Sequence, residues 1–242
     1  MASLQRERLD PGIEVLRLDR PDARNALDSA TLAELEAALA ELAADEALRV
    51  LVLSTTSERA LCAGADVAEE LDGEAATARM EAFTRVYAAV EAFPAPTVCV
   101  CVGNVVGAGA ELAAGCDLRV GGDNLKLAWA GARLGVPVGP ARLTPLVGLA
   151  AAKDLVLTGR TLGMEDARAL GLLARTAPAA LAEAAALDLA HSLAANPPEG
   201  MRRLKAMFRD VTGAAGHVAR ENAVLVEWQR AGGGLPRGGL RG

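Results

Sequence analysis

The sequence predicts an α/β fold in which a largely parallel sheet is followed by a helical C-terminal region. Short apolar runs that suit buried strands alternate with segments of helical periodicity in the first half of the chain. From about residue 150 onward, helical spacing predominates. The chain has 242 residues, which is long enough for one large domain with a substantial core.

The first strand and helix are expected near the N-terminus. Residues 12–20 (GIEVLRLDR) alternate apolar and polar side chains, which predicts a strand that ends at Pro21. Asp28, Ser29 and Thr31 then offer cap oxygens, and Glu34 stands three residues after Thr31, as in a capping box. Leucines at helical spacing predict one buried helix face (Leu32, Leu35, Leu39 and Leu42).

Further strands and helices follow in order. Apolar runs predict strands over residues 49–55 (RVLVLST), 96–102 (PTVCVCV) and 117–120 (DLRV). Helices are predicted over residues 151–159, 164–173, 180–195, 199–208 and 218–230. Such repeated strand, turn and helix units favour parallel strands in a layered architecture.

The composition excludes several classes of function. The net charge is −6 and the arginines are scattered, so no basic stripe is present to bind nucleic acid. The N-terminus has no apolar signal segment, and no window approaches the roughly 18 apolar residues that span a bilayer. We therefore expect a cytoplasmic protein that binds neither nucleic acid nor membrane.

The cysteines and histidines do not form a metal-binding pattern. The four cysteines lie in apolar stretches without CxxC spacing, far in sequence from His191 and His217. Cys99 and Cys101 alternate with valine, which is typical of small buried strand residues. We expect no metal site and reduced thiols.

Common catalytic signatures are also missing. The sequence has no GxxxxGK[ST] phosphate loop, no GxSxG nucleophile elbow and no HExxH pair. Gly107, Ala108 and Gly109 begin like a dinucleotide-binding loop, but Leu112 occupies the position of its third glycine. NAD binding is therefore only a remote alternative.

Two turns of small residues follow predicted strands. They are residues 61–66 (LCAGAD) and 103–111 (GNVVGAGAE), and each is expected to open a helix. A small residue at a helix start leaves its backbone N–H accessible, and two such donors aimed at one point polarise a carbonyl. Glu111 lies among Ala, Gly and Leu, where burial raises a carboxyl pKa and suits proton transfer. The alternative interpretation of Glu111 is a first-turn glutamate favoured by the helix dipole.

Three motifs in this order and spacing resemble the crotonase superfamily, also called the enoyl-CoA hydratase/isomerase family. They are RPDARNALD at 20–28, LCAGAD at 61–66 and GNVVGAGAELAAGCDLRV at 103–120. The resemblance covers residues 10–175. It implies a crotonase (ClpP-like) spiral of ββα units with a C-terminal helical subdomain, assembly as a homotrimer or as a hexamer of two trimers, and an acyl-CoA thioester substrate. It implies no cofactor apart from the coenzyme A of the substrate.

The resemblance also implies roles for individual residues. By position, the backbone N–H groups of Ala65 and Ala108 form an oxyanion hole for a thioester enolate, and Glu111 transfers a proton. The residues that match the CoA-binding segments are Arg24, Ala26, Cys62, Ala63, Gly64, Ala65, Asp66 and Gly107. A solvated charge at Arg24 and a plain helix cap at Asp66 are the alternatives.

One departure from the family pattern limits the predicted activity. Hydratases of the family use two glutamates to hold a water molecule, and the second position falls on Gly131. Hydration is therefore expected to be impaired unless another group substitutes, and the nearest candidates by sequence are Asp123, Arg133, Glu69 and Glu70. Double-bond isomerisation, decarboxylation and acyl-CoA binding without catalysis remain alternatives.

The C-terminus departs from the family as well. The acidic and aromatic segment that closes over the acyl pocket in hydratases is replaced here by Trp228 and a glycine-rich end. Trp129 and Trp228 are candidates to line the pocket, although a core or interface role is favoured. We expect a core spiral domain over residues 1–190, a helical trimerisation region over 191–230 and a flexible tail over 231–242.

Overall fold

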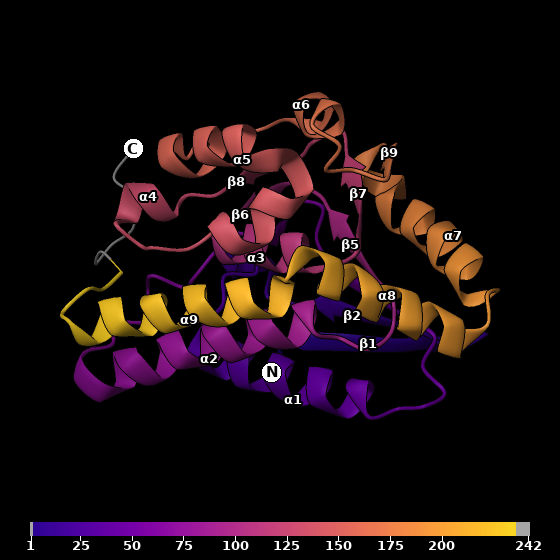
Figure 1. Cartoon of the computed structure of the whole chain (residues 1–242), viewed down its shortest axis with the longest axis horizontal. Helices are drawn as coiled ribbons and strands as arrows, with labels where there is room; N and C mark the ends of the chain where they lie inside the picture. The colour runs from indigo at the N-terminus through magenta and orange to yellow at the C-terminus, as the bar shows by residue number, and fades with distance from the viewer. Residues whose placement is uncertain (1, 236–242) are drawn as a thin grey trace.

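The computed structural model describes residues 2–235, and these residues form two sheets surrounded by helices (Figure 1). The larger sheet has six strands in the order β1-β2-β3-β5-β7-β9. Its strands are β1 (Leu4–Leu9), β2 (Ile13–Leu18), β3 (Val50–Thr55), β5 (Thr97–Cys101), β7 (Leu118–Gly122) and β9 (Arg175–Ala177). All neighbours pair in parallel except β1 and β2, which form an antiparallel hairpin. The predicted α/β class and largely parallel sheet are confirmed.

A second, smaller sheet explains the spiral. It contains β4 (Ala60–Cys62), β6 (Asn104–Val106) and β8 (Lys126–Ala128), all parallel. Successive units place one strand in each sheet and then a helix: β3 and β4 lead into α2 (Gly73–Glu91), and β5 and β6 lead into α3 (Ala108–Gly115). In the third unit, β7 and β8 lead into α4 (Gly131–Leu134) and α5 (Pro140–Thr158). This is the predicted spiral of ββα units.

The first helix is capped differently from the prediction. Helix α1 (Ser29–Ala43) begins after Asp28, whose side chain accepts a hydrogen bond from Thr31 N at 2.8 Å. Glu34 does not complete a capping box, because its Oε2 instead accepts a hydrogen bond from Ser3 N at 2.8 Å and ties down the N-terminal segment. The predicted leucine face is buried.

The larger sheet is covered on both faces. Alternate residues of β3 point to opposite sides, with Leu51 and Leu53 in the main core and Val50 and Val52 in a second apolar cluster. That second face is covered by α7 (Ala182–Ala194), which buries an alanine every four residues: Ala182, Ala186, Ala190 and Ala194. These short side chains allow the helix to approach the sheet closely, because they add little bulk between them.

The C-terminal region is largely helical, as predicted, with one exception. It contains α6 (Met164–Ala169), α7, α8 (Pro198–Thr212) and α9 (Ala214–Arg230), together with the single-turn 3₁₀ helix η2 (Ala179–Leu181). Figure 1 shows α8 and α9 end to end along one side of the molecule, and α9 lies against α2. The prediction missed β9, which pairs with β7 and extends the larger sheet.

The predicted domain limits can be placed on these elements. The limit between residues 190 and 191 lies inside α7. Most of the predicted flexible tail, residues 236–242, lies outside the described residues. Among the helices within residues 2–235, none has the length and apolar character needed to cross a bilayer.

Candidate active site

The two predicted turns leave the same edge of the small sheet. Strands β4 and β6 are adjacent and parallel, with Ala60 opposite Asn104 and Cys62 opposite Val105. The turn after β4 begins at Ala63, and the turn after β6 begins at Gly107. Because carboxyl ends of parallel strands meet at one edge, the fold brings both turns together, and this edge is where open α/β sheets bind ligands.

Glycines allow the two turns to face each other. A Cβ built on Gly107 would lie 3.9 Å from the Cα of Gly64, so no side chain separates the two backbones. Gly64 has φ 114° and Gly107 has φ 54°, conformations that residues with a Cβ rarely adopt. The close approach therefore depends on glycine at both positions.

A cavity of about 230 Å³ lies against these turns. Five of the predicted site residues line it: Ala63, Gly64, Ala65, Gly107 and Ala108. Its other walls are apolar and include Met80, Phe83, Tyr87, Val136, Val138 and Leu225. The fold thus gathers two main-chain turns and an apolar enclosure in one place.

The backbone N–H groups of Ala65 and Ala108 have no hydrogen-bond acceptor among residues 2–235. On either side of Ala65, Ala63 N donates to Arg24 O at 3.0 Å and Asp66 N donates to Leu27 O at 2.9 Å. Ala108 is the first residue of α3, where a helix cannot supply an internal acceptor. Two unbonded donors therefore belong to residues that line the same cavity.

The turn after β4 does not open a helix, contrary to the prediction. The next helix, α2, begins only at Gly73, and Asp66 does not cap it. Instead, Asp66 Oδ2 accepts a hydrogen bond from Arg20 Nη2 at 3.0 Å, and Asp66 Oδ1 accepts one from Ala68 N at 3.0 Å. Arg20 also pairs with Asp28 at 2.8 Å, so it fastens this turn to the start of α1.

Four of the residues matched to CoA binding do not line the cavity: Arg24, Ala26, Cys62 and Asp66. Arg24 is exposed, and its segment adjoins the turn because its carbonyl oxygen accepts the Ala63 hydrogen bond. Cys62 is fully buried at the end of β4, and burial raises the pKa of its thiol to about 12. The thiol of Cys62 is therefore a packing group rather than a reactive one.

Glu111 lies one helical turn beyond Ala108 and is 1% exposed, but it does not line the cavity. Its Oε2 accepts a hydrogen bond from Arg142 Nη1 at 3.1 Å, whereas its Oε1 is buried without a partner. The pKa of this carboxyl is raised to about 7, mainly because the group is buried. The positive charge of Arg142 lowers the pKa, and the negative charge of Glu221 raises it further. The indole N–H of Trp129 lowers the pKa of this carboxyl to a smaller extent, although it forms no hydrogen bond with a described residue.

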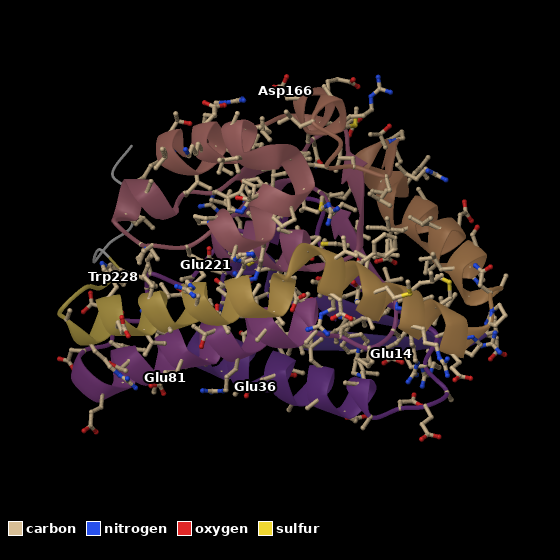
Figure 2. All side chains as sticks on the ribbon, in the orientation of Figure 1. Glu14, Glu36, Glu81, Asp166, Glu221 and Trp228 are labelled. Carbon is tan, nitrogen blue, oxygen red and sulfur yellow. The ribbon has the colours of Figure 1, made fainter. Side chains whose placement is uncertain are left out.

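The charged groups around Glu111 were not predicted from the sequence. Arg142 of α5 lies between Glu111 and Glu221 of α9, and it donates from Nη1 to Glu221 Oε1 at 2.7 Å. Figure 2 shows Glu221 on the side of α9 that faces α3 and α5. No sequence signal links positions 111, 142 and 221, because the fold alone brings their three helices together.

Gly131, the position that the resemblance assigns to a second glutamate, lines the cavity. A Cβ built there would lie 2.7 Å from Val136 O, so the local backbone leaves no room for a side chain. None of the four sequence neighbours named as substitutes lines the cavity (Asp123, Arg133, Glu69 and Glu70). Within the described chain, no carboxylate takes the place of the missing one in the cavity wall.

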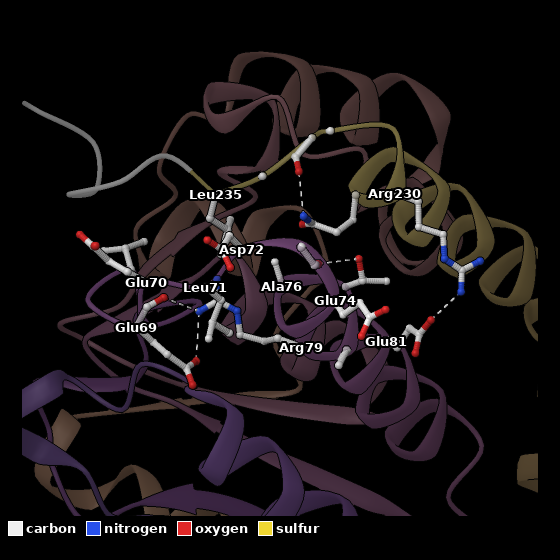
Figure 3. Close-up of a pocket in the computed structure, with 18 residues that line it drawn as sticks. Glu69, Glu70, Leu71, Asp72, Glu74, Ala76, Arg79, Glu81, Arg230 and Leu235 are labelled. Carbon is white, nitrogen blue, oxygen red and sulfur yellow. Dashed lines mark hydrogen bonds and ion pairs between the residues drawn. The ribbon is translucent and has the colours of Figure 1, made fainter.

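A larger surface cavity of about 720 Å³ adjoins the first one, since Val67 and Leu235 line both. Figure 3 shows carboxylates around it, with Glu69 paired to Arg79 and Glu81 paired to Arg230. No group of three or more His, Cys, Asp and Glu side chains among residues 2–235 has the arrangement of a metal site.

Comparisons with known proteins agree with the geometry. The family model described as enoyl-CoA hydratase/isomerase matches residues 8–225. A Mycobacterium bovis protein named as a probable enoyl-CoA hydratase is 36% identical over 173 residues, covering 70% of this chain and 67% of that protein. The 2,3-dehydroadipyl-CoA hydratase of Escherichia coli is 33% identical over 198 residues, covering 81% of this chain and 77% of the relative.

Solved structures share the fold. The crystal structure of an enoyl-CoA hydratase from Mycobacterium smegmatis matches with a TM-score of 0.78 and 28% identity, covering 93% of this chain and 91% of that one. Fold, motifs and family match coincide, and the chain belongs to the enoyl-CoA hydratase/isomerase family of the crotonase superfamily.

Proposed function

We propose that this protein is an acyl-CoA enzyme that stabilises a thioester enolate with the N–H groups of Ala65 and Ala108. The observation that carries the proposal is that both N–H groups lack acceptors within residues 2–235 and belong to residues that line one cavity. A developing enolate oxygen needs preorganised donors, and each such donor lowers the activation barrier by about 3 to 4 kcal/mol.

Glu111 is the proposed proton carrier. Its pKa of about 7 means that both its protonated and its charged form are populated near neutral pH, as a group needs if it is to act as acid and base in turn. Its position three residues after Ala108 places the two residues on the same face of α3. The oxygen Oε1 has no partner among the described residues that would compete for a proton.

The reaction that fits a single carboxylate is a proton shift rather than addition of water. Hydration in this family uses two glutamates, and Gly131 replaces the second. One carboxyl is sufficient to remove a proton from one carbon and return it to another, which moves a double bond through an enolate. We therefore propose double-bond isomerisation as the main activity, with hydration slow, although the relatives are named hydratases.

The cavity favours an uncharged acyl group. The side chains around it are apolar, and none of its described lining residues is Arg or Lys. The Escherichia coli relative is named for an acyl group that ends in a carboxylate, and burial of such a charge without a partner is costly. The proposed substrate is a monocarboxylic enoyl-CoA.

The phosphates of coenzyme A are proposed to bind near Arg24, on the part of the surface next to the Ala63 turn. Arg24 is exposed, and its backbone is bonded to the Ala63 turn. Among the described residues, the adjoining surface cavity is lined by five carboxylates and only two arginines, Arg79 and Arg230, so its net negative charge repels phosphate. Charge therefore directs the CoA head away from the acidic cavity.

The test is a substrate panel with matched variants. Crotonyl-CoA, a 3-enoyl-CoA and malonyl-CoA would be incubated with the wild-type protein, with Glu111→Gln and with Glu227→Gln, which alters an exposed glutamate on α9. We expect 3-enoyl-CoA to be isomerised, with turnover about 10²- to 10⁴-fold lower in Glu111→Gln and unchanged in Glu227→Gln. Full activity of Glu111→Gln contradicts the role of Glu111.

Acyl-CoA binding without catalysis is the second candidate function. It is favoured by the position of Glu111, which is outside the cavity wall and already paired with Arg142. Micromolar acyl-CoA binding by calorimetry, with no product from any member of the panel, would support it over the enzyme.

A further inference from the structure

Arg142 lies between two buried carboxyl groups from different helices. Its side chain is 1% exposed, and those of Glu111 and Glu221 are 1% and 9% exposed. Its Nη1 atom lies 3.1 Å from Glu111 Oε2 and 2.7 Å from Glu221 Oε1. One guanidinium nitrogen therefore joins the first turn of α3 to the middle of α9.

Other contacts fix the guanidinium in this orientation. Arg142 Nη2 donates to Asn222 Oδ1 at 3.0 Å, and Asn222 Nδ2 donates to Thr84 O in α2 at 3.0 Å. Glu221 Oε2 accepts a hydrogen bond from Ala141 N at 2.7 Å, which ties this carboxylate to the start of α5. Consecutive residues of α9 thus hold Arg142 in place.

The aromatic ring of Tyr87 supports the same group. The guanidinium carbon lies 4.9 Å from the ring centroid, within the range of a cation–π contact. Tyr87 also lines the cavity, so the guanidinium is stacked on the wall that a substrate would touch. Its planar shape suits this site better than the compact ammonium of lysine.

The two oxygens of Glu111 are consequently different. Oε2 accepts a hydrogen bond from a permanently charged donor, and a proton on that oxygen would oppose this bond. Oε1 is buried without a partner among the described residues. A Cβ built on Gly139 would lie 3.4 Å from Oε1, so glycine at 139 leaves space beside this oxygen.

We propose that Arg142, held by Glu221 and Asn222 of α9, is a positioning residue that fixes Oε2 of Glu111 and leaves Oε1 as the oxygen that takes up and releases the proton. The inference rests on the proposed function only for the source and destination of the proton, which are carbon atoms of the substrate. It adds that α9, a helix remote in sequence from both turns, sets the orientation and charge state of the carboxyl.

The surroundings give the expected direction of each change. Glu221 raises the pKa of Glu111 by like-charge repulsion, and Arg142 lowers it. Burial raises the pKa of Tyr87 well above its usual value, so this phenol stays neutral and does not compete. The thiol of Cys62 likewise stays protonated. His217 and Arg220 of α9 line a separate groove between α5 and α9, which Glu221 lines as well.

The experiment is infrared titration of the Glu111 carboxyl band, identified as the band missing in Glu111→Gln, in the full-length protein. Glu221→Gln is expected to lower the pKa of that band by about one unit, because it removes a like charge and leaves Arg142 Nη1 to Glu111 alone. Arg142→Gln is expected to raise it, and Arg142→Lys to raise it less. Glu227→Gln, the exposed control on the same helix, should leave it unchanged.

Opposite shifts in the Glu221 and Arg142 variants cannot come from general loosening of the fold. If Arg142→Gln does not fold, Glu221→Gln still decides, because the Glu221 side chain is the least buried of the three. Absence of a downward shift in that variant overturns the proposal. The proposed function is tested separately. If the pKa shifts are as expected but Glu111→Gln turns over 3-enoyl-CoA at the full rate, Glu111 has no catalytic role. The positioning of its carboxyl by Arg142 would still hold.

Discussion

Gly109 of α3 packs directly on the carbonyl group of Cys62 in β4. A Cβ built on Gly109 would lie 2.2 Å from Cys62 O and 2.9 Å from Cys62 Cβ. This contact sets the distance between the helix that begins at Ala108 and the strand that leads into Ala65. The geometry of the two proposed donors therefore depends on the missing side chain at position 109.

Gly109→Ala is expected to disturb both stability and binding. The added methyl meets backbone atoms that cannot rotate away, so α3 must shift, at a cost of about 1 to 3 kcal/mol. Urea unfolding and calorimetric titration with an acyl-CoA would measure both effects. The matched control is Gly200→Ala on α8, where no heavy atom lies within 4 Å of the built Cβ. Equal behaviour of the two variants would contradict the packing argument.

Ala108→Pro should remove one proposed oxyanion donor without breaking the helix. Ala108 is the first residue of α3, and proline is well tolerated at that position because its missing N–H has no helical partner. Loss of one donor typically lowers kcat by about 10²- to 10³-fold. Ala108→Gly keeps the N–H and serves as the control at the same site. The kinetic comparison fails to support the donor role if both variants turn over 3-enoyl-CoA equally.

Gly131→Glu should not restore hydration, although it supplies the second carboxylate of the family pattern, which this chain lacks. The new Cβ would lie 2.7 Å from Val136 O, and Gly131 O already accepts a hydrogen bond from Val136 N at 2.9 Å. We expect about 1 to 3 kcal/mol of destabilisation and no gain with crotonyl-CoA. Gly131→Ala separates the steric effect from the charge. A stable variant with hydration raised 10²-fold or more would show that the backbone adapts.

Those strands and helices with strong local patterns were predictable from the sequence. The alternation in residues 12–20 gives β2, and the apolar runs at 49–55 and 96–102 give β3 and β5. The three strands of the small sheet have only three residues each, too few for a period to be recognised. Strand β9 is equally short and mostly exposed, so its three residues could not be distinguished from the helical segments on either side.

The candidate site was predictable in part, for a related physical reason. The turns at 61–66 and 103–111 carry local glycine signals, and Ala65 and Ala108 indeed line one cavity. Arg142 and Glu221 carry no such signal, because an isolated arginine and an isolated glutamate on separate helices look like solvated charges. Only the packing of α5 and α9 shows that they share Glu111. Long-range charge networks of this kind are not encoded in local spacing.

Lys205→Met should weaken the attachment of α8 to the larger sheet. Lys205 is 7% exposed, and its Nζ donates to Asp117 Oδ2 at 2.7 Å and to Ala95 O at 3.0 Å. Removal of a charged donor from such a site costs about 2 kcal/mol, moderated here because Asp117 is partly exposed. Thermal or urea unfolding would measure the loss.

The same helix provides the control for that experiment. Arg203 pairs with Glu199 at 2.5 Å, but both side chains are more than three-quarters exposed. Exposed pairs of this kind contribute little, so Arg203→Met should change the free energy of unfolding by less than about 0.5 kcal/mol. Similar losses in the two variants would mean that burial of Lys205 does not matter.

Glu111 should make the folded protein less stable as the pH rises through the range between 4.5 and 7. The ordinary pKa of its carboxyl is 4.5, and in the fold it is raised to about 7, so in this range the folded state holds a proton that the unfolded state has released. The unfolded state therefore binds fewer protons, and the free energy of unfolding falls by roughly 3 kcal/mol from this group as the pH increases.

Glu111→Gln removes the titration but keeps the shape of the side chain. Urea unfolding at several pH values should show that the free energy of unfolding of Glu111→Gln increases relative to that of the wild type from pH 4.5 to 7. All other titrating groups are common to both proteins, so their effects cancel in this difference. Glu227→Gln should instead follow the wild-type curve, because its side chain is exposed on α9. Parallel curves for wild type and Glu111→Gln would mean that the buried carboxyl is charged throughout this range and that Arg142 outweighs burial.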